Sequence, residues 1–389
     1  MENHKTQFEQ WGPIDGRPLY ASFWFVFAMR IMQNRWGIHW PKLEGVFEQE
    51  KMAFYWNRDE HDHQGKKTIK IWLLPPKKFR FLKKSYNQSV AELKRIAKEV
   101  EKLTDKKDFN QTAKTVLKWY TVFNNFWLVA AVPEIANYSI PGYLEEALTP
   151  YIPDQAKRAE SLRVLLAPEL LSFHQKSELE LYRMYLNGGR HDLKSRLAKY
   201  AASWYWVENS YFESKYLNRE YFLEQLRNSN RIKIKNKVAK IEQYSAQIMR
   251  QKKVIATSNK LPSKILRLAS LLSYSIWWQD HRKSVIWWAN SIVDKLTQRA
   301  CKEFELSQNE IMYYIYDEWI KLFTKRKKLP SAVLKQRTKK FAVTIQLFGY
   351  KIFFGRQAKN IIKKFTGFAK IETEFLRGLT VSRGQIARG

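Results

Sequence analysis

One long run, SLLSYSIWWQDHRKSVIWWANSIVDKLTQRACKEF (residues 270–304), constrains the fold more than any other part of the chain. Apolar residues recur along it at the spacing of a helix. The tryptophan pairs Trp277-Trp278 and Trp287-Trp288 require extensive burial, because indole rings are large and mainly apolar. We therefore expect a long helix inside a large α-helical core.

A polar segment, QDHRK, interrupts this run between the two tryptophan pairs. It contains Asp280, His281, Arg282 and Lys283. Polar groups in an apolar environment need hydrogen-bonding or charged partners. These residues therefore indicate either a buried ion network, which we favour, or a patch that faces a phosphate group.

Several further segments also carry helix signals. The segment 112–132 (TAKTVLKWYTVFNNFWLVAAV) predicts a helix buried on most sides. Proline residues break the next stretch into short turns and helices, and a basic helix follows from Arg231. Three Ser-x-x-Glu patterns predict helix starts by the capping-box rule: Ser89 with Glu92, Ser177 with Glu180, and Ser307 with Glu310.

The N-terminal region carries a β signal. MAFYWN (52–57) and the partly alternating KKTIKIWLL (66–74) flank the polar segment RDEHDHQG, in which Gly65 suits a turn. We predict a hairpin here. The predicted fold is mainly α: an α+β region at 1–82 with this hairpin, then a multi-helix central domain at 83–370.

Composition excludes several classes of protein. Cys301 is the single cysteine, so the chain has neither a disulfide framework nor a cysteine-based zinc finger. The most apolar run, residues 19–32, is interrupted by Arg30 before it could span a bilayer. With no signal peptide in the sequence, these features predict a cytoplasmic protein without a membrane partner.

Positive charge is the strongest global signal. The sequence holds 69 Lys and Arg against 37 Asp and Glu, a formal charge of +32. Such a charge attracts nucleic acid and other anionic ligands. The basic residues are spread along the whole chain, so a merely solvated, lysine-rich surface explains them equally well.

Motifs for chemistry are few. The sequence has no GxGxxG and no Walker A pattern, so we predict no nucleotide cofactor in this chain. His61 and His63 could share a metal ion, but a solvated turn is the favoured interpretation and we predict no metal. Cys301 predicts a buried thiol, and no residue is predicted to be catalytic.

An aromatic stretch around residues 204–212 is the best candidate for ligand binding. Trp204, Trp206 and Tyr211 could line a cleft for a flat apolar ligand, or stack on bases. Packing among helices is the favoured alternative. Together with Asp280, Arg282 and Lys283, these three residues form the set of substrate-binding candidates.

The last third of the chain resembles a known family. The order QDHRK, LTQRACKEFELSQNEIMYYIYDEWIKLF, FGYKIFFGRQA and LRGLTVSRGQIARG is similar to the region that leads into the phosphohistidine domain of phosphoenolpyruvate-utilising enzymes. Phosphoenolpyruvate synthase, pyruvate phosphate dikinase and rifampin phosphotransferase belong to that group. The family pattern Glu-x-x-x-Gly-x-x-x-Ser-x-Gly-x-x-x-Gly falls on Glu374, Gly378, Ser382 and Gly384, while Gly389 lies one place later than its last glycine. The likeness is clearest over 271–389.

The resemblance implies a specific role. Residues 371–389 would be the first strand of a truncated phosphohistidine domain, with Gly378, Ser382 and Gly384 at its hinge and start. The chain lacks the family's histidine loop and its ATP-grasp domain, so it would be a fragment, inactive alone, of a phosphotransferase. ATP and Mg²⁺ are implied for the full enzyme, and the missing domains would be its partners.

Two other functions remain open. The first is a basic, non-enzymatic α-helical protein that binds nucleic acid or another polyanion. The second is a divergent substrate domain that holds a flat hydrophobic molecule against the aromatic stretch 204–212.

Overall fold

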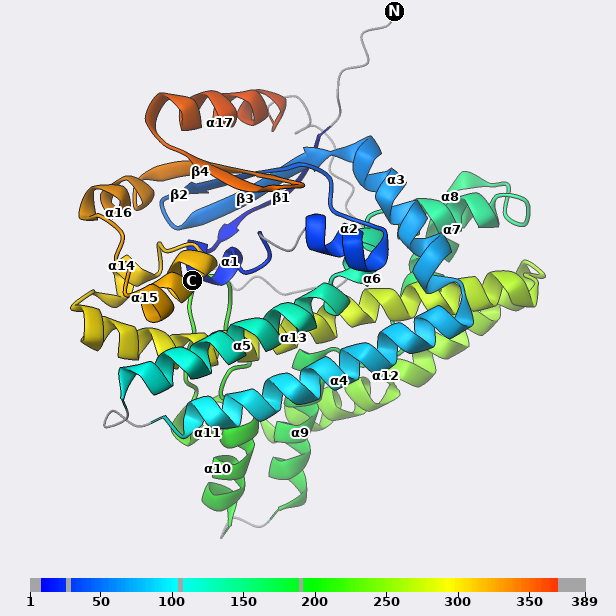
Figure 1. The fold of residues 1–389 in the computed structure, drawn as a ribbon. Coiled ribbons are helices and arrows are strands. Elements are labelled where there is room, and N and C mark those ends of the chain that lie inside the picture. Colours follow the sequence, from blue (N-terminus) through cyan, green and yellow to red (C-terminus); the bar gives the residue numbers. More distant parts are fainter. Residues whose placement is uncertain (1–7, 26–28, 104–107, 189–191, 370–389) are drawn as a thin grey trace, which may run out of the picture.

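The computed structural model describes residues 8–25, 29–103, 108–188 and 192–369. It is mainly α-helical, as the sequence predicts, with one small antiparallel sheet (Figure 1). Within these ranges, every helix is too short or too polar to span a membrane.

The sheet joins the two ends of the described chain. Its five strands run in the order β1-β3-β2-β4-β5, and every neighbouring pair is antiparallel. Helix α17 (Gly355–Ala369) covers one face, and the other helices lie on the opposite side (Figure 1). The strands are β1 (Phe8–Asp15), β2 (Leu43–Glu48), β3 (Lys51–Asn57), β4 (Lys340–Gln346) and β5 (Gly349–Phe353).

A hairpin is present near the N-terminus, but one of its predicted strands is wrong. MAFYWN lies in β3, and its hairpin partner is the preceding strand β2, through a turn at Gln49 and Glu50. The segment 66–74 is helical instead: α3 (Arg58–Thr68) continues into the π-helix η1 (Ile69–Leu73). Gly65 is not in a turn. It lies inside α3, where an added Cβ would be 2.9 Å from the carbonyl oxygen of Ile135.

Three long helices form the layer beneath the sheet. These are α4 (Pro76–Glu101), α5 (Phe109–Ala130) and α13 (Ser263–Phe304), with α12 (Arg231–Ser258) beside them (Figure 1). The long helix predicted over 270–304 is confirmed, because this segment lies in α13, which has 42 residues. Helix α5 is buried on most sides, as predicted, with Trp119 and Phe126 inaccessible to solvent.

Shorter helices connect these elements, and proline residues start several of them, as expected. They are α1 (Pro18–Ala21), α2 (Arg30–Trp36), α6 (Val132–Asn137), α7 (Ile140–Leu148), α8 (Gln155–Leu166), α9 (Phe173–Asn187), α10 (Leu193–Trp204), α11 (Arg219–Arg227), α14 (Gln308–Ile311), α15 (Tyr316–Lys325) and α16 (Ser331–Arg337).

One of the three predicted capping boxes is confirmed. Ser307 and Glu310 form a capping box at the start of α14. Ser89 lies inside α4 and donates to the carbonyl oxygen of Tyr86. Helix α9 begins earlier than predicted, because Ser172 and Gln175 form its capping box. Ser177 lies inside this helix, and its hydroxyl is hydrogen-bonded to the hydroxyl of Tyr200 on α10.

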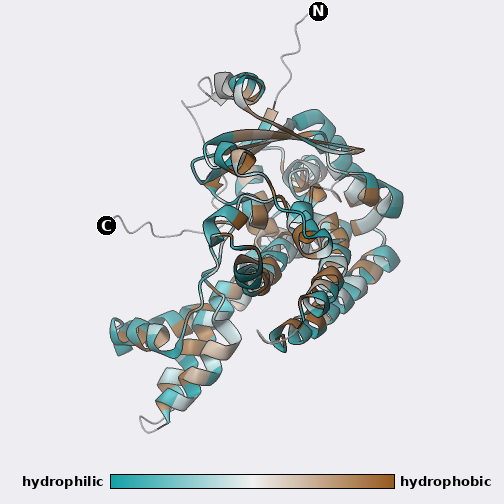
Figure 2. Ribbon diagram, turned by 60° about the vertical axis from the view of Figure 1, so that its left-hand side comes forward, coloured by the Kyte–Doolittle hydropathy of each residue, from teal (hydrophilic) through white to brown (hydrophobic). Residues whose placement is uncertain are grey.

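Buried side chains form one large core and one satellite. The large core lies between the sheet and the helices α4, α5, α13 and α15, and the satellite lies among α9, α10, α11 and α12. Figure 2 shows hydrophobic residues concentrated on the inward sides of these helices. Helices α9 to α11 project away from the sheet (Figure 1). The predicted domain limit at residue 82 falls inside α4, and β2 pairs with β4 across it.

The predicted start of a phosphohistidine domain at 371–389 lies outside the described residues. Gly378, Ser382 and Gly384 therefore have no structural description here.

Candidate functional site

A cavity of about 630 Å³ lies between the sheet and α13, and we call it the sheet-side cavity. Strands β1, β2 and β3 form one wall, while α5, α6 and α13 form the others. Its lining includes Trp11, Phe23, Trp24, Trp40, Phe54, Trp56, Trp127, Glu134, Tyr138, Tyr211, Asp280, Arg282, Lys283 and Trp287.

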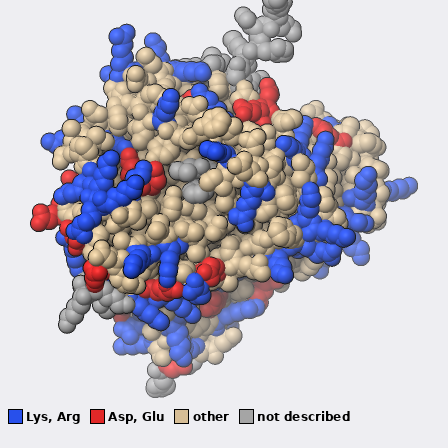
Figure 3. Space-filling model, in the orientation of Figure 1, with Lys and Arg blue, Asp and Glu red and all other residues tan. Residues whose placement is uncertain are grey.

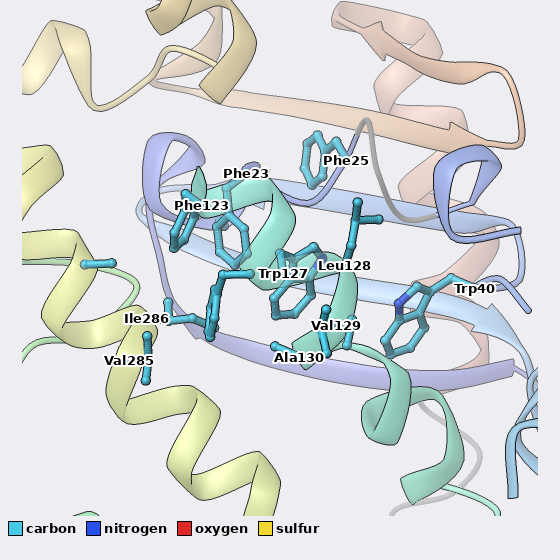
Figure 4. Close-up of a cluster of buried hydrophobic side chains, with 14 of the residues drawn as sticks. Phe23, Phe25, Trp40, Phe123, Trp127, Leu128, Val129, Ala130, Val285 and Ile286 are labelled. Atoms are coloured by element: carbon cyan, nitrogen blue, oxygen red, sulfur yellow. The ribbon is translucent and has the colours of Figure 1, made fainter. Parts of the chain in front are cut away.

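Aromatic rings dominate this lining and fix its shape. Figure 4 shows Phe23 beside Trp127 between the sheet and α13, with Trp40 further along the same space. Trp11 stacks on Phe54 with 5.7 Å between ring centroids, and Trp24 lies 5.1 Å from the same ring. Close-packed rings leave flat apolar surfaces, which suit a planar ligand.

The cavity also contains a buried cation, Arg282. Its side chain is 8% exposed and pairs with Glu134 on α6. The guanidinium carbon lies 5.1 Å from the centre of the Trp127 ring, a cation–π contact. Burial lowers the pKa of Arg282 to about 10. The Nε of Arg282 has no hydrogen-bond acceptor in the described structure, although an arginine donor so deeply buried normally has one.

Two further charged residues complete the polar part of the cavity. Burial lowers the pKa of Lys283, whose Nζ lies 4.5 Å from the centre of the Trp287 ring. Burial raises the pKa of Asp280, and a hydrogen bond from the Phe173 amide to Oδ2, at 2.9 Å, opposes that rise. With Arg282 and Glu134, these residues give two positive and two negative charges. Asp15, the third carboxylate in the lining, is exposed and pairs with Lys51, so the inner cavity is nearly neutral.

A second, smaller depression of about 270 Å³ lies on the other side of α13, between α4, α9 and the end of α10. We call it the lysine groove. Its lining includes Lys94, Leu171, Phe173, Lys176, Ser203, Trp204, Trp206, Trp277, Asp280, His281, Ser284 and Trp288. Asp280 lines both the groove and the sheet-side cavity.

The six substrate-binding candidates from the sequence divide between these two places. Tyr211, Arg282 and Lys283 line the sheet-side cavity, Trp204 and Trp206 line the lysine groove, and Asp280 lines both. The aromatic stretch is therefore not the wall of one cleft. We interpreted QDHRK as part of a buried ion network, and this holds in part, because Arg282 belongs to a buried ion pair.

The other candidate residues have structural roles. His61 is not in a solvated turn: it is fully buried in α3, with Nδ1 3.2 Å from Oε2 of Glu9. Among the described residues, no group of three or more His, Cys, Asp or Glu side chains could hold a metal ion. Cys301 is only partly buried, and that burial raises the pKa of its thiol.

Sequence reasoning missed most of the cavity wall. Trp24, Trp40 and the stretch that holds Trp127 and Glu134 are three separate segments, which meet only in the folded chain. The one available signal was Glu134 itself, an acidic residue within the apolar stretch at 126–136, which needs a cationic partner.

Comparison with known proteins gives no relative: no family model, no curated protein and no solved structure matches the chain.

Proposed function

We propose that this chain binds a flat, mainly apolar small molecule in the sheet-side cavity, as the central helical, acceptor-binding part of a phosphoenolpyruvate-utilising phosphotransferase. The observation that carries the binding proposal is the buried Arg282 donor without an acceptor, set among aromatic rings. The resemblance of residues 271–389 to that family supports the phosphotransferase context.

The chemistry of the lining defines the ligand class. Stacked and edge-on rings favour a planar body, and the near-neutral inner charge does not favour a multiply charged one. The open Nε donor of Arg282 favours a ligand oxygen, such as a phenol hydroxyl or a carbonyl. A volume of about 630 Å³ is in the usual range of small-molecule sites. A hydroxyl held in this way is the kind of group that accepts a phosphoryl group.

Calorimetric titration with planar aromatic alcohols, using 1-naphthol as the first probe, tests the proposal. We expect saturable binding to the wild-type chain, weakened at least about tenfold by Trp24→Ala, which removes about 1.4 kcal/mol or more of ring contact. Trp204→Ala is the matched control, because Trp204 lines only the lysine groove. The absence of binding across a panel of such alcohols, or equal losses in both variants, would refute the proposal.

Polyanion binding is a second candidate, favoured by exposed basic clusters. Lys233, Lys235 and Lys240 are exposed on α12, and the segment 325–328 is exposed at the end of α15. Figure 3 shows Lys and Arg side chains gathered toward both ends of the molecule on the face in view. Binding to single- or double-stranded nucleic acid should then fall steeply with salt, in proportion to the phosphates contacted. Salt-independent binding, or none, excludes it.

A further inference from the structure

The lysine groove differs from the sheet-side cavity in its charge. Lys94 on α4 and Lys176 on α9 both line it, and neither forms an ion pair with a carboxylate among the described residues. Of the described residues that line the groove, Asp280 is the one carboxylate. Two lysines against one carboxylate leave the groove with a net positive charge.

A third donor comes from His281. Burial, together with the positive charges of Lys176 and Lys94, lowers its pKa to about 4. The imidazole is therefore neutral at pH 7. Its Nδ1 lies 2.8 Å from the hydroxyl of Tyr86, and the tautomer of the ring decides which of the two groups donates. In the tautomer protonated at Nε2, Tyr86 donates to Nδ1, and the described residues provide no acceptor for the Nε2 proton.

Tryptophan rings supply the apolar side of the groove, and their polar edges are already engaged. The indole N–H of Trp204 donates to Glu180 at 2.9 Å, that of Trp206 to the carbonyl oxygen of Ser203 at 2.9 Å, and that of Trp277 to the carbonyl oxygen of Leu171 at 3.1 Å. These bonds fix the ring positions. Trp204 and Trp206 also pack on each other, with 5.5 Å between ring centroids, and Lys176 lies over the ring of Trp277. Trp204 and Trp206 are only partly buried, so a ligand could still cover them.

We infer that the lysine groove is a second binding site, for a small aromatic anion whose ring stacks on Trp204 or Trp206 and whose charged group lies between Lys94 and Lys176. A volume of about 270 Å³ fits one ring with a carboxylate or a phosphate group, and not a larger ligand. Ring stacking and two cations act on different parts of such a ligand, so both contribute to its affinity. The inference is independent of the proposed function, since it uses the opposite face of α13.

Phenyl phosphate and benzoate are the probes, with benzyl alcohol and inorganic phosphate as single-feature controls. The readout is the indole ¹⁵N–¹H signals of Trp204 and Trp206, assigned by Trp→Phe substitution. We expect saturable shifts with phenyl phosphate, benzoate or both. We expect binding of each control to be at least about tenfold weaker, since each lacks one of two contacts worth about 1.4 kcal/mol or more. Which anion binds more tightly identifies the charged group.

The double variant Lys94→Met, Lys176→Met keeps the aliphatic stems and removes both charges. Affinity for the anionic probe should fall at least about tenfold, while Lys98→Met, an exposed lysine one turn further along α4, should leave it within about twofold. Circular dichroism checks that the variants fold. The inference is overturned if no indole signal shifts, if either control binds as tightly as the anions, or if the double variant binds as well as wild type. The two proposals can fail separately, because 1-naphthol binding is tested with Trp24→Ala in the sheet-side cavity, whereas the anions are followed at Trp204 and Trp206 in the lysine groove.

Discussion

The segment QDHRK of α13 borders two sites that differ in how their charges are balanced. Toward the sheet, Arg282 is buried and balanced by Glu134, and aromatic rings enclose the pair. Toward α4 and α9, Lys94 and Lys176 are exposed and have no carboxylate partner in the part of the chain that the structure describes, and their charge acts on the neutral His281. Depth accounts for the difference, because a buried charge requires a partner whereas an exposed one is stabilised by water.

The largest expected effect is on the buried side. Arg282→Met leaves Glu134 as an uncompensated, 18%-exposed carboxylate and should lower the free energy of unfolding by about 3–5 kcal/mol. Arg326→Met is the matched control, because its pair with Glu303 is largely exposed and should be worth less than about 1 kcal/mol. Urea unfolding measures both. The double variant Arg282→Met, Glu134→Gln should recover part of the loss, and equal costs at Arg282 and Arg326 would remove the distinction between the two faces.

His281 provides the second test, from the groove side. Its pKa is about 4 in the folded chain and about 6.5 when unfolded, so the unfolded chain binds more protons between these values. Stability is therefore fully present above pH 6.5 and is lost as the pH falls toward 4. The loss from this residue is at most about 3 kcal/mol, because one pKa unit corresponds to about 1.4 kcal/mol and the ring is partly exposed.

His281→Gln should flatten that part of the profile of unfolding free energy against pH. His63→Gln, at an exposed position, should not change it. Lys176→Met adds a sharper readout, because removal of this charge should raise the pKa of His281, measured by NMR titration. If the pKa of His281 does not move in Lys176→Met, the charge of Lys176 does not act on the imidazole in the groove.

The sequence predicts the helices well because their signals are local. The apolar spacing of 270–304 and of 112–132 depends only on neighbouring residues, and both segments are helices in the structure. The N-terminal hairpin is harder to predict from the sequence. The turn between β2 and β3 uses Gln49 and Glu50, both with positive φ (46° and 65°), where Asn-Gly is the usual signal. Gly65 led to the prediction of a turn that is not there. Its lack of a side chain allows α3 to approach α6 closely instead.

The two binding surfaces could be predicted only in part. The polar residues of QDHRK stand out against an apolar helix, so Asp280, Arg282 and Lys283 were recognisable. The placement of Arg282 and Lys283 in one site, and of Asp280 beside both, depends on which helices pack on each side of α13. Trp204 and Tyr211 are close in sequence, yet the chain leaves α10 between them and places them in different sites. Local sequence carries no information on such long-range packing.

The smallest expected effect is at Asp280, the residue that the two faces share. Asp280→Asn keeps an oxygen to accept from the Phe173 amide but replaces a charged acceptor by a neutral one, so we expect a stability cost of about 1 kcal/mol. Removing one negative charge beside both sites should also tighten anion binding a few-fold at the lysine groove. The affinity of neutral 1-naphthol for the sheet-side cavity should not change, because a neutral ligand does not respond to net charge. Calorimetry on the same variant measures both affinities. Equal changes for the anion and the neutral probe would mean that Asp280 acts through the packing of α9 on α13, not through its charge.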